Sequence, residues 1–125
     1  MSHLSRGRCK IKDLFTLREV VEQKGLKIKE VKQMRGNYIG RINCEFVITD
    51  GHGQIAVVDV GNNEYELQMD NWQNSIVGKA GHDGSLLTRD YQTEVHKKEA
   101  QLLGGIIAGQ EVDSQGYVYL EVHTP

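Results

Sequence analysis

The first third of the chain combines strand-like and helix-like patterns. Residues 5–12 place a basic side chain at every second position, with small or apolar residues between them, which is the period of a strand with one buried face. Asp13 then precedes apolar residues at helical spacing, and Gly25 follows them. An acidic N-cap and a glycine stop predict a helix over residues 14–24. Residues 26–34 are charged and moderately alternating, which indicates a strand near a sheet edge.

Clear apolar–polar alternation continues through the middle of the chain. It covers residues 42–49, 55–60 and 64–70. Turn sequences at Asp50-Gly51 and Gly61-Asn62 separate these segments, so we predict an antiparallel meander of three strands. Residues 71–85 are the least regular segment, and a loop of this length in a compact domain is often functional or mobile.

The last third predicts a helix and a hairpin. Leu87, Tyr91 and Leu102 share one helical face from about residue 85, and Gly104-Gly105 ends it. Strands are expected at residues 106–112 and 117–123. The order β-α-β-β-β-β-α-β-β predicts an α+β two-layer sandwich, a mainly antiparallel sheet of about seven strands with two helices on one face. A length of 125 residues predicts a single domain, residues 1–125.

Charge is distributed unevenly along the chain. Residues 1–41 contain eleven lysines and arginines and four acids, a net charge of +7, whereas the whole chain carries −2. The remaining residues therefore carry −9. A basic segment of this kind can bind a small anion, and it can also bind the acidic half of a second copy.

The alternating basic strand is the best candidate for a binding site. Arg6, Arg8, Lys10 and Lys12 project from one side of it. Such a row repels itself unless an anion faces it, and arginine can hold a phosphate with two hydrogen bonds. The alternative is an ordinary solvated face, or pairing with the chain's own acids. Nucleic acid is the poorer ligand, because the net charge is negative and no aromatic residue lies between the bases to stack on them.

Three residues outside this strand complete the candidate ligand-binding set. They are His3, Tyr91 and Lys98. Lys98 stands within an apolar helical stripe, where an ammonium group needs a partner. That partner is either a ligand or Glu94, one turn earlier.

Metal, cofactor and catalytic chemistry are not predicted. The five histidines have no close partner in sequence; His52 and His82, near Asp50 and Asp83, would share a metal only if their loops met.

The two cysteines, Cys9 and Cys44, fall on inward strand faces and are expected to be buried, reduced thiols. No apolar stretch is long enough to span a bilayer or to act as a secretory signal. We therefore expect a cytoplasmic protein, or one in an equivalent reducing compartment.

Several short motifs together resemble a known family. They are the start Met1-Ser2-His3-Leu4-Ser5, the basic strand, the helix ending at Gly25, Gly61-Asn62, Tyr65-Glu66-Leu67, Asp70 with Trp72, Tyr91 opening a helix, and Ala100 before a glycine pair. The chain resembles the hypothetical chloroplast reading frame 35 family, also known as domain of unknown function 1257. The resemblance implies a fold and a compartment, but no activity and no catalytic residue.

Three functional interpretations remain open at this point. The first is a non-enzymatic protein that holds a small phosphate-bearing, nucleotide-like ligand on its basic N-terminal face, with a subunit interface as one location. The second is a protein–protein adaptor whose basic half docks an acidic partner or a second copy, which would make the protein a homo-oligomer. The third is a small enzyme built around residues 71–85.

Overall fold

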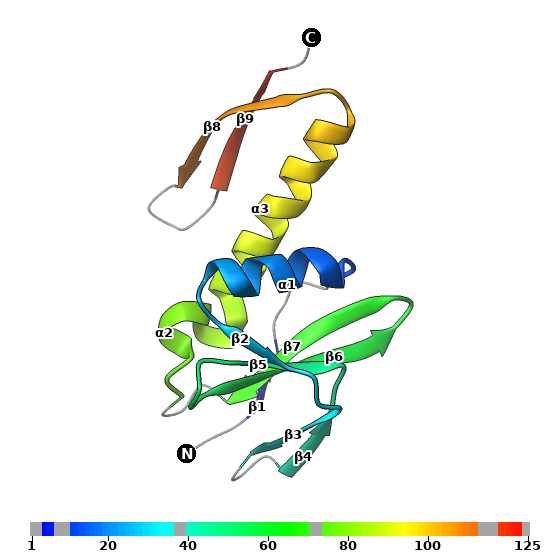
Figure 1. Ribbon diagram of the computed structural model, residues 1–125, viewed down its shortest axis with the longest axis vertical. Coiled ribbons are helices and arrows are strands. Elements are labelled where there is room, and N and C mark those ends of the chain that lie inside the picture. Colours follow the sequence, from blue (N-terminus) through cyan, green and yellow to red (C-terminus); the bar gives the residue numbers. More distant parts are fainter. Residues whose placement is uncertain (1–3, 7–10, 37–39, 71–73, 113–117, 124–125) are drawn as a thin grey trace. The chain divides into compact units, whose positions relative to one another are not determined.

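The computed structural model describes residues 4–6, 11–36, 40–70, 74–112 and 118–123. The chain clusters into two compact units, Met1–Thr88 and Arg89–Pro125. The elements are helices and antiparallel strands, which confirms the α+β class (Figure 1). Within the described residues, no helix is long and apolar enough to cross a membrane.

Helix α1 (Leu14–Gln23) begins and ends as the sequence predicts. The Asp13 carboxylate accepts hydrogen bonds from the Thr16 N–H at 3.1 Å and the Thr16 hydroxyl at 2.6 Å. At the other end Gly25 adopts φ +73°, its N–H donates to Glu22, and the Leu26 N–H reaches back to Val21. This hydrogen-bond pattern is the Schellman motif, and its left-handed residue strongly favours glycine.

The main sheet has five antiparallel strands. In spatial order they are β1 (Leu4–Arg6), β7 (Glu64–Asp70), β6 (Gln54–Gly61), β5 (Phe46–Thr49) and β2 (Lys27–Lys29). The predicted meander is confirmed, because β5, β6 and β7 pair consecutively. Asn62 and Asn63 both have positive φ, 57° and 59°, and they join β6 to β7 in a two-residue turn.

The core lies on both faces of this sheet. On one face the aligned pairs Phe46–Val57 and Ile48–Ile55 are fully buried, and the Arg18 guanidinium of α1 stacks 4.1 Å from the centroid of the Phe46 ring. On the opposite face a hairpin of β3 (Gln33–Gly36) and β4 (Gly40–Asn43) packs its apolar side against β5 and β6. The buried residues of this second cluster are Met34, Cys44, Val47 and Ala56. Figure 1 shows α1 and the β3–β4 hairpin on opposite sides of the sheet.

The alternation predicted one sheet of about seven strands. The described strands instead form three separate sheets. The β3–β4 hairpin and a hairpin of β8 (Ile106–Val112) and β9 (Val118–His123) form separate two-stranded sheets. The predicted strand over residues 42–49 breaks because the chain changes partners within it. The Cys44 N–H still donates to Lys32, whereas the Glu45 N–H donates to Val57 of the main sheet.

The segment predicted to be irregular, residues 71–85, contains two short helical turns. Helix α2 covers Val77–Ala80 and the 3-10 turn η1 covers His82–Gly84. Ile76 and Ala80 are fully buried, so this part of the chain contributes to the core. Residues 71–73 lie outside the described part, and the predicted mobility of the loop stays a prediction.

Helix α3 (Ser85–Leu102) matches the second predicted helix. It also ends in a Schellman pattern: Gly104 has φ +82°, and the Gly105 N–H donates to Ala100 at 2.8 Å. The β8–β9 hairpin follows within the second unit.

Candidate anion-binding face

The structure describes only part of the predicted basic strand. His3, Arg8 and Lys10 lie outside the described residues. Arg6 contributes its backbone to β1 at the edge of the main sheet. Lys12 is well exposed, and its Nζ lies 3.9 Å from a Glu64 carboxylate oxygen on β7. This pair is consistent with the alternative that the chain's own acids neutralise some of these bases.

The two C-terminal candidates, Tyr91 and Lys98, belong to α3. Tyr91 is only 5% exposed, which leaves little of its ring for a ligand, and Lys98 is half-buried. Glu94 does pair with a lysine of the helix, namely Lys97 at 3.6 Å. The assignment of Tyr91 and Lys98 to a ligand site stays a prediction.

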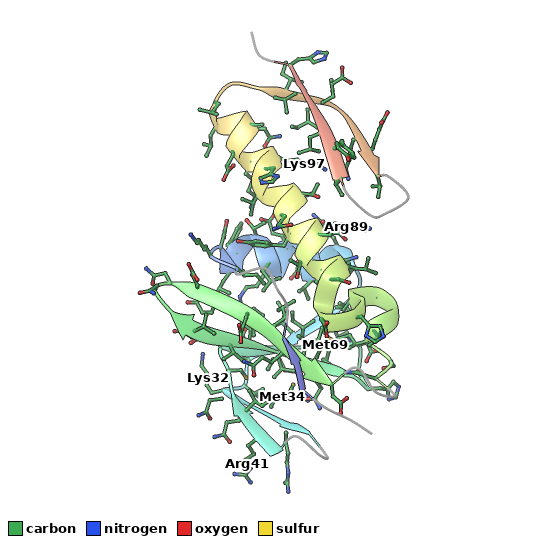
Figure 2. The ribbon with its side chains drawn as sticks, turned by 180° about the vertical axis from the view of Figure 1, so that it is seen from behind. Lys32, Met34, Arg41, Met69, Arg89 and Lys97 are labelled. Carbon is green, nitrogen blue, oxygen red and sulfur yellow. The ribbon has the colours of Figure 1, made fainter. Side chains whose placement is uncertain are left out.

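A second basic feature, which the charge pattern did not single out, lies on the β3–β4 hairpin. Arg35 and Arg41 are directly opposite each other in its register. Side chains of directly paired residues project from the same face of a sheet. Met34 and Ile42, the next pair, take the other face and pack on the main sheet. The arginines therefore point away from the core, and Figure 2 labels Arg41 on the outer side of the hairpin.

The outward surface of β3 and β4 is polar at each described position. The Gln33–Asn43 pair shares it with the arginines, and the Gln33 amide donates to the Asn43 side-chain oxygen at 3.2 Å. We call these four residues the arginine face: Gln33, Arg35, Arg41 and Asn43.

The two arginines have no acidic counterpart among the described residues, in contrast to Arg18 and Lys32. Arg18 pairs with Glu30, and its hydrogen bond to that carboxylate lowers the pKa of Glu30. Lys32 pairs with Glu45 at 3.4 Å and also donates to the Glu45 carbonyl at 3.0 Å. Like charges directly opposite on a hairpin destabilise it. An anion held between two guanidinium groups would reverse that repulsion through charge-assisted hydrogen bonds.

A signal for this face does exist in the sequence. Residues 33–36 read Gln-Met-Arg-Gly, and residues 40–43 read Gly-Arg-Ile-Asn, which mirrors the order polar, apolar, arginine, glycine. A mirrored pattern about a short loop is what a hairpin with one buried face requires. The two glycines, with Asn37 between them, are typical of a loop, and a loop over residues 35–40 would not pair the two arginines.

The sequence allowed a metal shared by His52 and His82 only in the case that their two loops met. Among the described residues, no group of three or more His, Cys, Asp or Glu side chains is placed to hold a metal ion. Asp50 instead builds its own turn: its carboxylate accepts from the Ser75 hydroxyl at 2.6 Å and from the N–H groups of His52 and Gly53. These hydrogen bonds, with that of Ser75 the largest contributor, lower the pKa of Asp50 from 3.8 to about 2.

The predicted state of Cys44 is confirmed. It is buried and unpaired, and burial raises the pKa of its thiol. A protonated thiol of this kind behaves as a small apolar side chain and is a poor nucleophile. Cys9 lies outside the described residues.

Comparison of the chain with known protein families, curated proteins and solved structures finds no match, and its function is therefore inferred from the arginine face and the charges around it.

Proposed function

We propose that this protein binds a small phosphate-bearing, nucleotide-like ligand on its basic N-terminal face, and that it acts by binding rather than by catalysis. The observation that carries the proposal is the exposed cross-strand pair Arg35 and Arg41, which stands opposite no acid within the described residues. The pair lies inside the segment of the chain that carries +7.

Phosphate fits this arrangement better than a single carboxylate does. Each guanidinium group presents a planar fork of N–H donors, and a phosphate offers three oxygens and up to two negative charges. Two forks on neighbouring strands can therefore both be satisfied by one phosphate. Arg6, Arg8, Lys10 and Lys12 belong to the same basic segment, and we propose that they add further contacts to the ligand.

Identity with the resembled family is also a proposal. Membership of the chloroplast reading frame 35 family would support a reducing compartment such as the cytoplasm. It would not name the ligand, because the resemblance implies no activity.

The experiment compares Arg35→Gln and Arg41→Gln with the unchanged protein in titrations with inorganic phosphate, pyrophosphate and a nucleoside diphosphate. Binding is measured by calorimetry and by the ligand-dependent rise of the melting temperature. Each variant should bind at least tenfold more weakly, since a hydrogen bond to a charged group contributes about 1.5–3 kcal/mol. Added salt should weaken binding to the unchanged protein.

Lys32→Gln provides the matched control for these variants. It removes the same charge from the start of the same hairpin, but from a base that Glu45 already neutralises. Its affinity for phosphate should therefore change little. An equal loss of phosphate affinity in all three variants would mean that only the net charge of the protein matters, which contradicts a specific site. Unchanged affinity in both arginine variants would also refute the proposal.

The adaptor interpretation is favoured by a different observation, the exposed apolar side chains of the second unit. It leads to a separate inference about assembly.

A further inference from the structure

The β8–β9 hairpin, which we call the tail hairpin, has an unusually apolar surface. Most of the large apolar side chains that are exposed in the described residues lie in it or at the end of α3, namely Leu102, Leu103, Ile106, Val112, Tyr119 and Val122. Within the described residues of β8 and β9, none is buried. Large exposed apolar surfaces of this kind mark interaction sites more often than they mark free surface.

The backbone of the tail hairpin is also incompletely paired. In the described part of the chain it forms a sheet of only two strands, so no described strand pairs with the outer edge of either β8 or β9. An isolated two-stranded hairpin is at best marginally stable in water. Addition of a further strand would complete the hydrogen bonding of one edge and cover apolar surface at the same time.

The charge of the tail hairpin indicates which kind of strand could be added to its edge. Residues 99–125 contain four acids, Glu99, Glu111, Asp113 and Glu121, and neither lysine nor arginine. A second tail hairpin would bring acids against acids. The complementary partner is an extended segment that alternates basic and apolar residues.

Such a segment exists in the chain itself, at the edge of the main sheet. Strand β2 reads Lys27-Ile28-Lys29, and it is the last strand on its side of the sheet. Both lysines are exposed, and the structure shows no ion pair for either of them with a described residue. Ile28 lies opposite Ile48 and is half-buried.

Strand β9 matches this edge in its alternation. Leu120 and Val122 project from one face of β9, and Glu121 projects from the other. When Ile28 of β2 is aligned with Val122, Lys29 stands opposite Glu121, and the apolar residues continue the core side of the sheet. Glu121 also contacts His123 at 2.9 Å, but both side chains remain well exposed to a further cation.

We propose that β9 of one copy adds as a sixth strand to β2 in the main sheet of a second copy. Lys27 and Lys29 prevent two β2 edges from pairing with each other, whereas they attract an acidic strand. If each copy donates β9 to the other, the contact closes into a dimer with two equivalent strand additions. This assembly goes beyond the proposed ligand binding, because Arg35 and Arg41 take no part in it.

The test uses charge reversal on the two strands, with the mass of the particle measured by light scattering after size exclusion over a range of protein concentrations. The unchanged chain should form dimers whose dissociation constant rises with salt. Lys27→Glu/Lys29→Glu in one variant, and Glu121→Lys in another, should each weaken self-association by roughly tenfold or more, because positions 29 and 121 then carry like charges in both strand additions.

Mixing the two variants supplies the decisive observation. In the mixture each β9 meets a β2 of opposite charge, so a heterodimer should form at protein concentrations at which each variant alone is mostly monomeric. This rescue also shows that the variants are folded. The proposal would be overturned if the unchanged chain were monomeric at every concentration. It would also be overturned if the charge-reversal variants dimerised as strongly as the unchanged chain.

A further variant separates this assembly from the ligand site. Arg35→Gln/Arg41→Gln should leave the dimer intact while it reduces phosphate binding. Loss of the dimer in this variant would overturn the assignment of the interface to β2 and β9.

Discussion

At the scale of single residues, Asp50 shows how an acidic side chain can stabilise a turn by hydrogen bonding instead of binding a metal. Its carboxylate holds the β5–β6 turn through two backbone N–H groups and joins that turn to Ser75 through a hydroxyl. All three donors favour the ionised form, and they lower the pKa of Asp50 to about 2. Stability is therefore linked to pH at this residue.

The sign of that linkage gives a first prediction. The folded-state pKa lies below the ordinary value of 3.8, so the contribution of the ionised Asp50 is present above about pH 4 and is lost as pH falls towards 2. Asp50→Asn should be less stable than the unchanged protein at pH 6, and the difference should shrink between pH 4 and pH 2.5. Urea unfolding at several pH values measures this. A difference that stays constant across the range would contradict the role of the charge.

At the scale of elements, the β5–β6 turn packs closely against the segment before α2. A Cβ on Gly53 would lie 2.0 Å from the Asn74 side-chain oxygen and 2.9 Å from the Ile76 nitrogen. The Asn74 amide in turn donates to the Asp70 carbonyl at 2.6 Å, which fixes the end of β7 to the same place. The segment predicted to be an irregular loop is thus attached to the sheet through this contact.

Two glycine substitutions test this contact. Gly53→Ala should lower the free energy of unfolding by about 1–3 kcal/mol, the usual cost of overpacking. Gly78→Ala, in α2, has open space around its Cβ and should be neutral or stabilising by up to about 1 kcal/mol. Urea unfolding of both variants provides the comparison. Equal effects would indicate a general response to alanine rather than a steric clash at Gly53.

Local patterns predicted the elements better than they predicted how the strands pair. Helix α1 and its two caps follow from Asp13 and Gly25, because capping involves residues close together in sequence. The break at Cys44 does not follow, since the alternation continues through a position where the chain leaves Lys32 and begins to pair with Val57. Which strand a segment meets depends on distant residues, and alternation alone does not encode that choice.

The candidate site was predictable in kind but not in position. The net charge of residues 1–41 pointed to an anion, whereas the strand singled out first falls largely outside the described residues. Arg35 and Arg41 become a pair only through the register of β3 and β4. The net charge of a segment does not reveal that register. The mirrored order of residues around the loop does indicate it.

At the scale of the whole molecule, the main sheet and the tail hairpin differ in how many apolar side chains they bury. The strands β5, β6 and β7 supply fully buried side chains such as Phe46, Ile55 and Leu67. The tail hairpin has none among its described residues. Cooperative stability follows buried apolar contact, so the tail hairpin should open at a much lower free energy than strands β5, β6 and β7.

Hydrogen exchange measures this difference. Amides of β5–β7 should exchange slowly at any protein concentration, because they open only with the main core. Amides of the tail hairpin should exchange quickly in dilute protein and more slowly at high concentration, where strand addition protects them. Glu121→Lys should abolish the concentration dependence. Slow exchange of the tail at every concentration would show that the hairpin is stable without a partner.

The burial of Cys44 beneath the β3–β4 hairpin makes this thiol a natural reporter of the arginine face. Its sulfur lies 3.6 Å from the Val31 carbonyl, within the cluster that the hairpin covers. A thiol reagent can reach it only while the hairpin is lifted, so the labelling rate follows the opening equilibrium of that hairpin. A phosphate that bridges Arg35 and Arg41 would hold the two strands together and slow the labelling of Cys44. In a Cys9→Ser variant, Cys44 is the only thiol of the chain, so its labelling rate reports how much of the ligand site is occupied.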